Sequence, residues 1–299
     1  MGIISIKNIS KTYPGKTPIT ALDDISLDIQ KGELFGLIGP DGAGKTSLFR
    51  ILTTLISPDK GSASVDTFDV ITQFREIRST VGYMPGRFSL YQDLTTEENL
   101  TFFADAFNCS LEENYDLIKD IYIQIEPFRK RKAGKLSGGM KQKLALCCAL
   151  IHRPAILFLD EPTTGVDPVS RKEFWDMLKH LKEQKITTMI STPYMDEACL
   201  CDRIALIQSG KILSVNTPTQ IIEKYPHRLY AVKSENNYLL LERLKKQKEI
   251  TSCYIFGEYL HVTFSGDEVE IPNAEVVEIK PGIEDCFIQL MTKNESDNN

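Results

Sequence analysis

The segment GPDGAGKT, Gly39 to Thr46, constrains the fold more than any other feature of this 299-residue sequence. It fits the pattern G-x-x-x-x-G-K-[ST] and lies between a buried apolar strand at 33–39 and a helical pattern at 46–55. Glycines there let backbone N–H groups turn inward around phosphates, and the helix N-terminus adds its positive dipole end. A glycine-rich turn that matches by chance is the alternative, but strand, Lys45, Thr46 and helix together favour a phosphate-binding loop.

Acidic residues follow a second uninterrupted apolar strand, in the stretch AILFLDEP. This strand delivers Asp160 at its carboxyl end, where ligands bind in α/β sheets. Asp160 and the Thr46 hydroxyl can hold Mg²⁺, Lys45 can reach the β- and γ-phosphates, and Glu161 can polarise an attacking water. Alone, an acid pair after a strand is typical of a cap. Beside a phosphate loop, the metal and water roles are favoured.

The order of the segments predicts an α/β fold with added parts. Residues 3–30 alternate apolar and polar in two runs, which indicates antiparallel strands. Strands alternating with helices predict a largely parallel sheet, formed by segments near 33–39, 156–160, 187–191 and 203–208. We expect a nucleotide-binding domain over 1–220 with a helical insertion at about 87–150. Residues 221–299 are expected to form a small α+β domain that ends in a frayed tail, NESDNN.

Net charge, the lengths of the apolar runs and the cysteine spacing argue against several other classes of protein. The formal net charge of -6 argues against broad nucleic-acid binding. Apolar runs such as LALCCALI (144–151) are far shorter than the roughly 20 residues that cross a bilayer, and no secretory signal is visible at the N-terminus. The seven cysteines are odd in number and lack C-x-x-C spacing, which favours reduced thiols in a cytosol over disulfides or a zinc site.

The segment LSGGMKQK (136–143) adds a second anion-binding helix end. Ser137 is a predicted N-cap, and Gly138 and Gly139 expose N–H groups at the start of the next helix. Beside the phosphate loop and LFLDEP, this segment closely resembles the signature motif of ABC ATPases. Within them, FSLYQDLTTEENL, GVDPVSR, YMDEA and PGIEDCFIQL resemble ATP-binding subunits of ABC-2-type exporters, the multidrug-efflux group. The resemblance covers roughly residues 3–220.

The resemblance implies a P-loop NTPase fold with an antiparallel β subdomain, and a role for each motif residue. It makes Asp160 the Walker B acid, Glu161 the catalytic carboxylate beside Lys45, and Asp167 the acid of the loop that crosses to the other subunit. Tyr13 matches the aromatic that stacks on adenine, although an ordinary turn tyrosine is its alternative reading. The implied nucleotide-binding residues are Tyr13, Gly39, Pro40, Asp41, Gly42, Ala43, Gly44, Lys45, Thr46, Ser47, Ser137, Gly138 and Gly139.

Partners also follow from the resemblance. ABC ATPases work as head-to-tail dimers with two ATPs between them, so Ser137 to Gly139 would contact ATP bound to the opposite subunit. A second ATP-binding subunit, identical or not, and a transmembrane ABC-2-type permease are therefore expected, with no nucleic acid. The insertion at about 87–150 would face the permease, with RFSLYQDLTTEENL (87–100) lining the groove for its coupling helix. The implied location is the cytoplasmic face of the cell membrane.

Two positions depart from the family. A glutamine that joins the Mg²⁺ and water shell is replaced by Gly86, and a histidine that contacts the γ-phosphate is replaced by Pro193. Neither can supply the lost hydrogen bond, and Gln92 is a poor substitute by position. Both losses fall on the composite site built from this chain's own Walker motifs.

Three functional readings follow. The first is an exporter subunit in an asymmetric dimer, whose own Walker site hydrolyses slowly; a homodimer that tolerates both changes is its variant. The second is a regulatory ATP-binding subunit with little catalysis. The third is a soluble ABC ATPase acting on ribosomes or DNA, which usually carries two cassettes or a long coiled coil, and this chain has neither.

Overall fold

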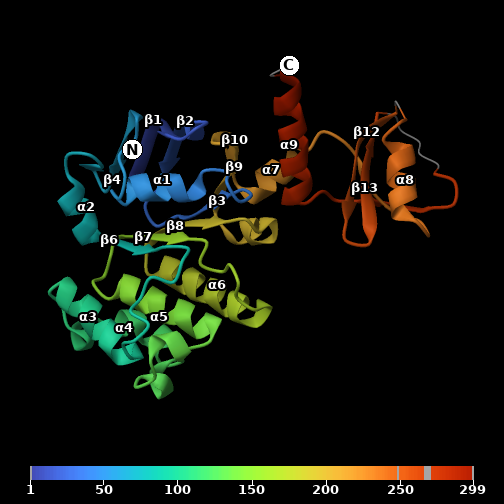
Figure 1. The fold of residues 1–299 in the computed structure, drawn as a ribbon. Helices are drawn as coiled ribbons and strands as arrows, with labels where there is room; N and C mark the ends of the chain where they lie inside the picture. Colours follow the sequence, from blue (N-terminus) through green and yellow to red (C-terminus); the bar gives the residue numbers. More distant parts are fainter. Residues whose placement is uncertain (1, 248, 266–270, 298–299) are drawn as a thin grey trace. The chain divides into compact units, whose positions relative to one another are not determined.

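The computed structural model describes residues 2–247, 249–265 and 271–297. The chain divides into two compact units, with the break between residues 217 and 218 (Figure 1). The break falls slightly before the boundary expected at 220, because the helix that begins at Pro218 belongs with the second unit.

A mixed six-stranded sheet forms the centre of the first unit, in the order β10-β9-β3-β8-β7-β6. Its strands are β3 (Leu34–Ile38), β6 (Val81–Met84), β7 (Ile156–Asp160), β8 (Thr187–Thr192), β9 (Arg203–Gln208) and β10 (Lys211–Asn216). All neighbouring pairs are parallel except β9 with β10. Every residue of β3, β7 and β8 is buried, which explains why these segments are continuous apolar runs or, in β8, neutral throughout.

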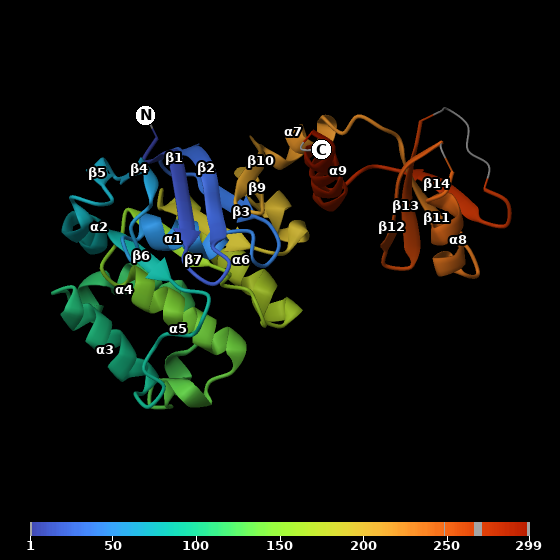
Figure 2. The same ribbon diagram turned by 45° about the horizontal axis from the view of Figure 1, so that its top comes forward.

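An antiparallel sheet in the order β2-β1-β4-β5 accompanies it. Its strands are β1 (Ile4–Tyr13), β2 (Ile19–Ile29), β4 (Lys60–Val65) and β5 (Phe68–Asp69). Figure 2 shows β1 and β2 side by side. Helix α1 (Lys45–Leu52) joins the two sheets through one buried core, in which the rings of Phe49 and Phe158 meet edge to face with centroids 5.9 Å apart. The expected α/β fold with an antiparallel subdomain is confirmed.

Most helices of the first unit lie between β5 and β8 along the sequence. They are α2 (Phe74–Thr80), α3 (Thr96–Ala106), α4 (Leu111–Tyr122), α5 (Gly138–Leu150) and α6 (Pro168–Glu183). Helices α3, α4 and α5 lie together in both views (Figure 1, Figure 2). Capping boxes fix the starts of α3 and α4, since Thr95 and Ser110 each exchange hydrogen bonds with a glutamate three residues on.

The second unit has its own antiparallel sheet, in the order β12-β13-β11-β14, and its own apolar core. Its elements are α7 (Pro218–Glu223), β11 (Leu229–Lys233), α8 (Asn237–Leu244), β12 (Ile250–Phe256), β13 (Tyr259–Phe264), β14 (Glu275–Ile279) and α9 (Ile283–Asp297). Helix α9 continues through 294–297, where the sequence predicted a frayed tail, because no proline or glycine interrupts 283–297. Residues 298–299 of that expected tail lie outside the described residues.

The ring pair in the core gives a test of stability. We expect Phe158→Ala to lower the free energy of unfolding by about 3–5 kcal/mol, because it leaves a cavity against Phe49. The single tryptophan, Trp175, is buried in the first unit, so its fluorescence during urea unfolding reports that unit. The control Ile123→Ala, at a position 54% exposed, should change stability by about 0.5 kcal/mol or less. Equal losses of unfolding free energy in Phe158→Ala and Ile123→Ala would contradict the placement of Phe158 in the core.

Candidate functional site

Three strands of the parallel sheet end side by side. Ile38 of β3 pairs with Thr192 of β8, and Ser191 of β8 pairs with Asp160 of β7. Because the strands are parallel, the segments that follow them leave from the same edge of the sheet. The phosphate loop, Glu161 and Pro193 are therefore neighbours, although Thr46 and Pro193 are 147 positions apart.

Glycines are required in the phosphate loop by its backbone. A Cβ at Gly39 would lie 2.2 Å from the Ile207 carbonyl oxygen, and a Cβ at Gly44 would lie 2.2 Å from the Ala21 carbonyl oxygen. Gly42 has open space around it but a φ of +78°, and Gly44 has a φ of +106°. Other residues rarely adopt these values. The loop between β3 and α1 thus has the curvature that turns its N–H groups toward an anion.

Lys45 places a positive charge inside this loop. Its side chain is 3% exposed, and Nζ donates to the carbonyl oxygens of Gly39 at 2.8 Å and Pro40 at 3.0 Å. Nζ also lies 3.0 Å from Oε1 of Glu161. The structure therefore brings together the two residues predicted to act on the phosphates and on the attacking water.

Asp160 is the most buried acid of the site, with 2% of its surface exposed. Burial raises the pKa of Asp160, and hydrogen bonds from the hydroxyls of Ser191 and Thr46 oppose that shift. The Ser191 hydroxyl donates to Oδ1 at 2.6 Å. A buried carboxylate beside a hydroxyl matches the oxygen ligands that Mg²⁺ prefers, and a bound cation would offset the desolvation of the charge. Ser191 had no role assigned from sequence, because its partner comes from another strand.

A cavity of about 430 Å³ opens beside these groups. It is lined by Thr46, Arg50, Tyr83, Pro85, Gly86, Arg87, Asp160 and Glu161. Sequence reasoning missed the two arginines. Arg50 lies one helical turn after Thr46, a spacing that the sequence displays. Arg87 follows Gly86 directly, so this cavity is bordered by two cations as well as two acids.

The two departures from the family lie at this same edge. A Cβ at Gly86 would lie 3.0 Å from the carbonyl oxygen of Asp160, so the loop passes close to the end of β7. Pro193 directly follows β8. Gln92 does not line the cavity, and its carbonyl oxygen accepts instead from the Gly134 N–H at 2.9 Å.

Tyr13 lies at the end of β1, beside the phosphate loop. Its hydroxyl lies 3.2 Å from the Ser47 Oγ, within hydrogen-bonding distance, and either group can donate. This contact ties the predicted adenine-stacking ring to the residue after Thr46. The structure thus brings Tyr13 and Ser47 to the other residues of the loop.

The signature segment lies elsewhere on the unit. Ser137 caps α5 by accepting from the Met140 N–H at 3.3 Å, as predicted. Ser137 and Gly138 are exposed, and neither they nor Gly139 line the cavity beside Thr46. Asp167 caps α6 by accepting from two backbone N–H groups, at 3.1 and 3.0 Å. These residues therefore do not border the cavity beside this chain's own phosphate loop.

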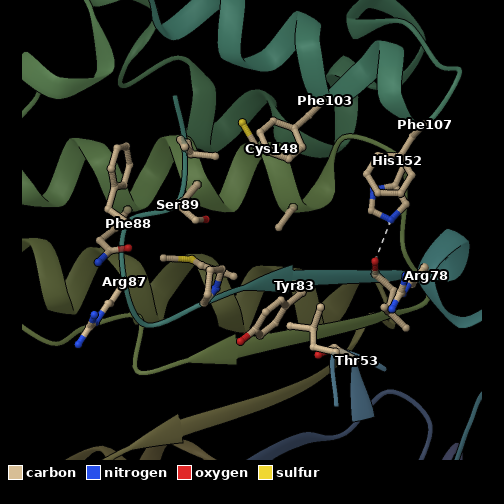
Figure 3. A pocket seen from close by; sticks show the side chains of 18 residues that line it. Thr53, Arg78, Tyr83, Arg87, Phe88, Ser89, Phe103, Phe107, Cys148 and His152 are labelled. Atoms are coloured by element: carbon tan, nitrogen blue, oxygen red, sulfur yellow. Dashed lines mark hydrogen bonds between the residues drawn. The ribbon is translucent and has the colours of Figure 1, made fainter. Parts of the chain in front are cut away.

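A second, mainly apolar cavity of about 310 Å³ lies against the helices (Figure 3). Its walls include the segment 87–90, Phe103 and Phe107 of the helical region, Cys148 of α5, and His152, which follows α5. Phe107 and His152 stack with centroids 3.8 Å apart, and burial lowers the pKa of His152. Arg87 lines this cavity and the one beside Glu161, so it lies between the two.

The fold and the site define a P-loop NTPase. Residues 22–164 match the family described as ABC transporter. The ATP-binding cassette MJ0796, solved as a post-hydrolysis dimer bound to ADP and Pi, has a TM-score of 0.65 and 27% sequence identity, covering 72% of this chain and 98% of that one. In the part of the chain that the structure describes, no helix has the length and apolar character needed to cross a membrane.

Relatives with described roles agree with this class. The chain is 37% identical over 303 residues, 97% of its length, to the probable multidrug ABC transporter ATP-binding protein YbhF of Escherichia coli, of which it covers 52%. It is 38% identical over 223 residues to the Nod factor export ATP-binding protein I of Burkholderia lata, covering 74% of this chain and 72% of that protein. The chain belongs to the ABC transporter family, as one of its ATPase cassettes, and spans about half the length of YbhF.

The buried lysine gives a test of the site. We expect Lys45→Ala to weaken ATP binding about ten- to hundredfold, because charge-assisted hydrogen bonds contribute about 1.5–3 kcal/mol. Lys45→Arg should not restore binding, since a planar guanidinium does not fit the space of a buried ammonium. Titration calorimetry with ATP measures the change, and Lys182→Ala, which removes a surface ion pair, is the control. Wild-type affinity in Lys45→Ala would exclude this loop as the phosphate site.

Proposed function

We propose that this chain binds and hydrolyses ATP to drive a membrane exporter. The observation that carries the proposal is the meeting of Lys45, Glu161 and Asp160 at one edge of the sheet, with Lys45 Nζ 3.0 Å from Glu161 Oε1. In this arrangement Lys45 binds the β- and γ-phosphates and Glu161 takes the proton of the attacking water. Tyr13 stacks on adenine, while its hydroxyl is held by Ser47.

Magnesium belongs to the proposal. Thr46 and Asp160 would hold the ion, which supplies charge neutralisation to the phosphates when bound. Hydrogen bonds from Ser191 and Thr46 fix the orientation of the Asp160 carboxylate before an ion arrives. This preparation is the contribution of the chain itself to metal binding.

An asymmetric pair of ATP sites is the finer proposal. Gly86 and Pro193 remove two hydrogen-bonding groups from the site built on this chain's Walker motifs, whereas Ser137 to Gly139 are intact for the other site. The match with YbhF covers 97% of this chain but 52% of that relative. The chain then holds ATP at its own site and turns it over slowly, beside a second, faster subunit. A regulatory subunit with little catalysis is the alternative that the same two positions support.

The permease partner and the cellular place are also proposals. The apolar cavity lined by residues 87–90, Phe103 and Phe107 has the chemistry to receive an amphipathic helix. An ABC-2-type permease that inserts its coupling helix there would hold the chain on the cytoplasmic face of the membrane. Relatives named for multidrug transport and Nod factor export support export as the direction.

Turnover by the purified chain tests the asymmetry. We expect slow hydrolysis by the native chain and a rise of about 10²–10³ in Pro193→His combined with Gly86→Gln, since one restored contact to the γ-phosphate contributes about 2–4 kcal/mol in the transition state. If the native chain already hydrolyses ATP at a rate that the double variant does not improve, the asymmetric reading is wrong.

Two control variants distinguish the effect of an added hydrogen-bonding group from that of a change in side-chain size. Gly86→Ala introduces the Cβ that lies 3.0 Å from the Asp160 carbonyl without adding a donor, and Pro193→Ala removes the ring without adding one. Neither should raise the rate. Glu161→Gln in the double variant should abolish turnover, which shows that the activity belongs to this chain. Undetectable turnover by the double variant, with ATP still bound, would favour the regulatory alternative.

The apolar cavity yields a separate test. We expect Phe103→Arg to reduce co-purification with a membrane protein at least tenfold, because a desolvated cation would occupy the docking surface. ATP binding should not change, since Phe103 does not line the cavity beside Thr46. Tagged chain expressed in its native cells and extracted in mild detergent provides the measurement. Co-purification with ribosomes or DNA in place of a membrane protein would favour the soluble alternative.

A further inference from the structure

A buried acid lies just beyond Pro193. Glu197, in the short helical turn Met195–Leu200, is 1% exposed. Its Oε2 accepts hydrogen bonds from the Thr192 hydroxyl at 2.5 Å and from the Thr163 hydroxyl at 3.1 Å. Both threonines are fully buried. Since a buried charge is expensive without partners, these two bonds fix the positions of the groups that make them.

Arg171 of α6 completes the cluster from the other side. Its Nε lies 3.6 Å from Oε1 of Glu197, and its guanidinium lies 4.0 Å from the centroid of the Tyr194 ring. The two residues that flank Pro193 are therefore both held, Thr192 by Glu197 and Tyr194 by Arg171. Among the described residues, neither Arg171 Nε nor Glu197 Oε1 has a hydrogen-bond partner. A small movement would therefore let these two atoms form a hydrogen bond with each other.

The other end of the cluster leads to the signature segment. Thr163 lies in the loop between Glu161 and Asp167, and a Cβ at Gly138 would lie 3.7 Å from the carbonyl oxygen of Gly165 in that loop. A Cβ at Gly139 would lie 2.5 Å from the Ser170 Oγ on α6, so α5 and α6 are in tight contact there. A continuous series of contacts thus joins the end of β8 to the start of α5.

We propose that Glu197 and Arg171 are positioning residues that make the Pro193 segment, the loop 161–167 and α6 move as one body. Glu197 itself does not line the cavity beside Thr46. The consequence is that nucleotide at this chain's own site sets the placement of Ser137 to Gly139, which serve the other ATP site. This inference rests on the proposed head-to-tail pairing, and hydrogen-bonded networks of this kind carry such coupling.

Hydrogen exchange on the full-length chain tests the proposal without a partner. The protein is kept dilute enough to remain monomeric, as checked by light scattering, and exchange is compared with and without Mg²⁺-ATP. In the native chain we expect ATP to slow exchange in peptides of the phosphate loop and also in those covering 137–143. An effect limited to the phosphate loop would overturn the coupling. No effect at the phosphate loop would instead contradict ATP binding, and with it the proposed function.

The decisive variants are a matched pair at one position. Thr163→Val keeps the shape of the side chain but removes the hydroxyl bonded to Glu197, whereas Thr163→Ser keeps the hydroxyl. We expect Thr163→Val to lose at least four-fifths of the ATP effect at 137–143, with ATP affinity within twofold of native. Thr163→Ser should retain the effect. Coupling that survives intact in Thr163→Val would overturn the proposal.

Variants of the ion pair complete the test. Arg171→Ala should also lose the effect at 137–143, and Arg171→Lys should not restore it, because an ammonium does not stack on Tyr194 as a guanidinium does. Asp196→Asn is the control: Asp196 lies 3.7 Å from Arg171 but is 74% exposed, so we expect native behaviour. Thermal melting confirms that each variant is folded. If Asp196→Asn lost as much of the ATP effect at 137–143 as Thr163→Val, the role proposed for Glu197 would be wrong.

Discussion

The parallel pairing of β8 with both β3 and β7 is the constraint on which the rest of the site depends. It fixes Ile38 beside Thr192 and Asp160 beside Ser191, so three loops from distant parts of the chain begin at one edge. Every residue of the three strands is buried, and a slip of one residue would turn each side chain to the opposite face. The same strand register therefore fixes both the packing of the sheet and the positions of the residues predicted to bind phosphate.

Each buried or partly buried charge in the site has a group beside it that offsets it. Burial opposes the ionised form of Asp160, and two hydroxyls partly offset this effect. Lys45 offsets Glu161 at 3.0 Å, and Arg50 and Arg87 border the same cavity. Gly86 and Pro193 leave this arrangement of charges in place and remove only neutral hydrogen-bonding capacity. Under the proposed function, nucleotide binding and nucleotide turnover thus depend on different groups, which explains how one can persist while the other weakens.

Much of this could be predicted from sequence because the signals were local. The phosphate loop, its flanking strand and helix, the Ser137 cap and the apolar strands each occupy a few consecutive residues. The cluster around Glu197 could not, since Thr163 is 34 positions away and their contact depends on sheet register and side-chain rotamers. Arg87 was visible in the sequence, but only the cavity showed that it borders two sites. The frayed tail expected from residue 294 is helical as far as Asp297, and no helix-breaking residue is present in 283–297.

The close approach of Gly86 to the end of β7 links the size of the residue at position 86 to the position of Asp160. A Cβ there would lie 3.0 Å from the Asp160 carbonyl oxygen, so a larger side chain requires the loop or the end of β7 to shift by a few tenths of an ångström. Gly86→Gln therefore changes the site in two ways: it adds a hydrogen-bonding group, and it moves the backbone next to the predicted metal ligand. Gly86 is in this sense a spacer, which sets how closely the loop approaches the strand whatever bonds it makes or lacks.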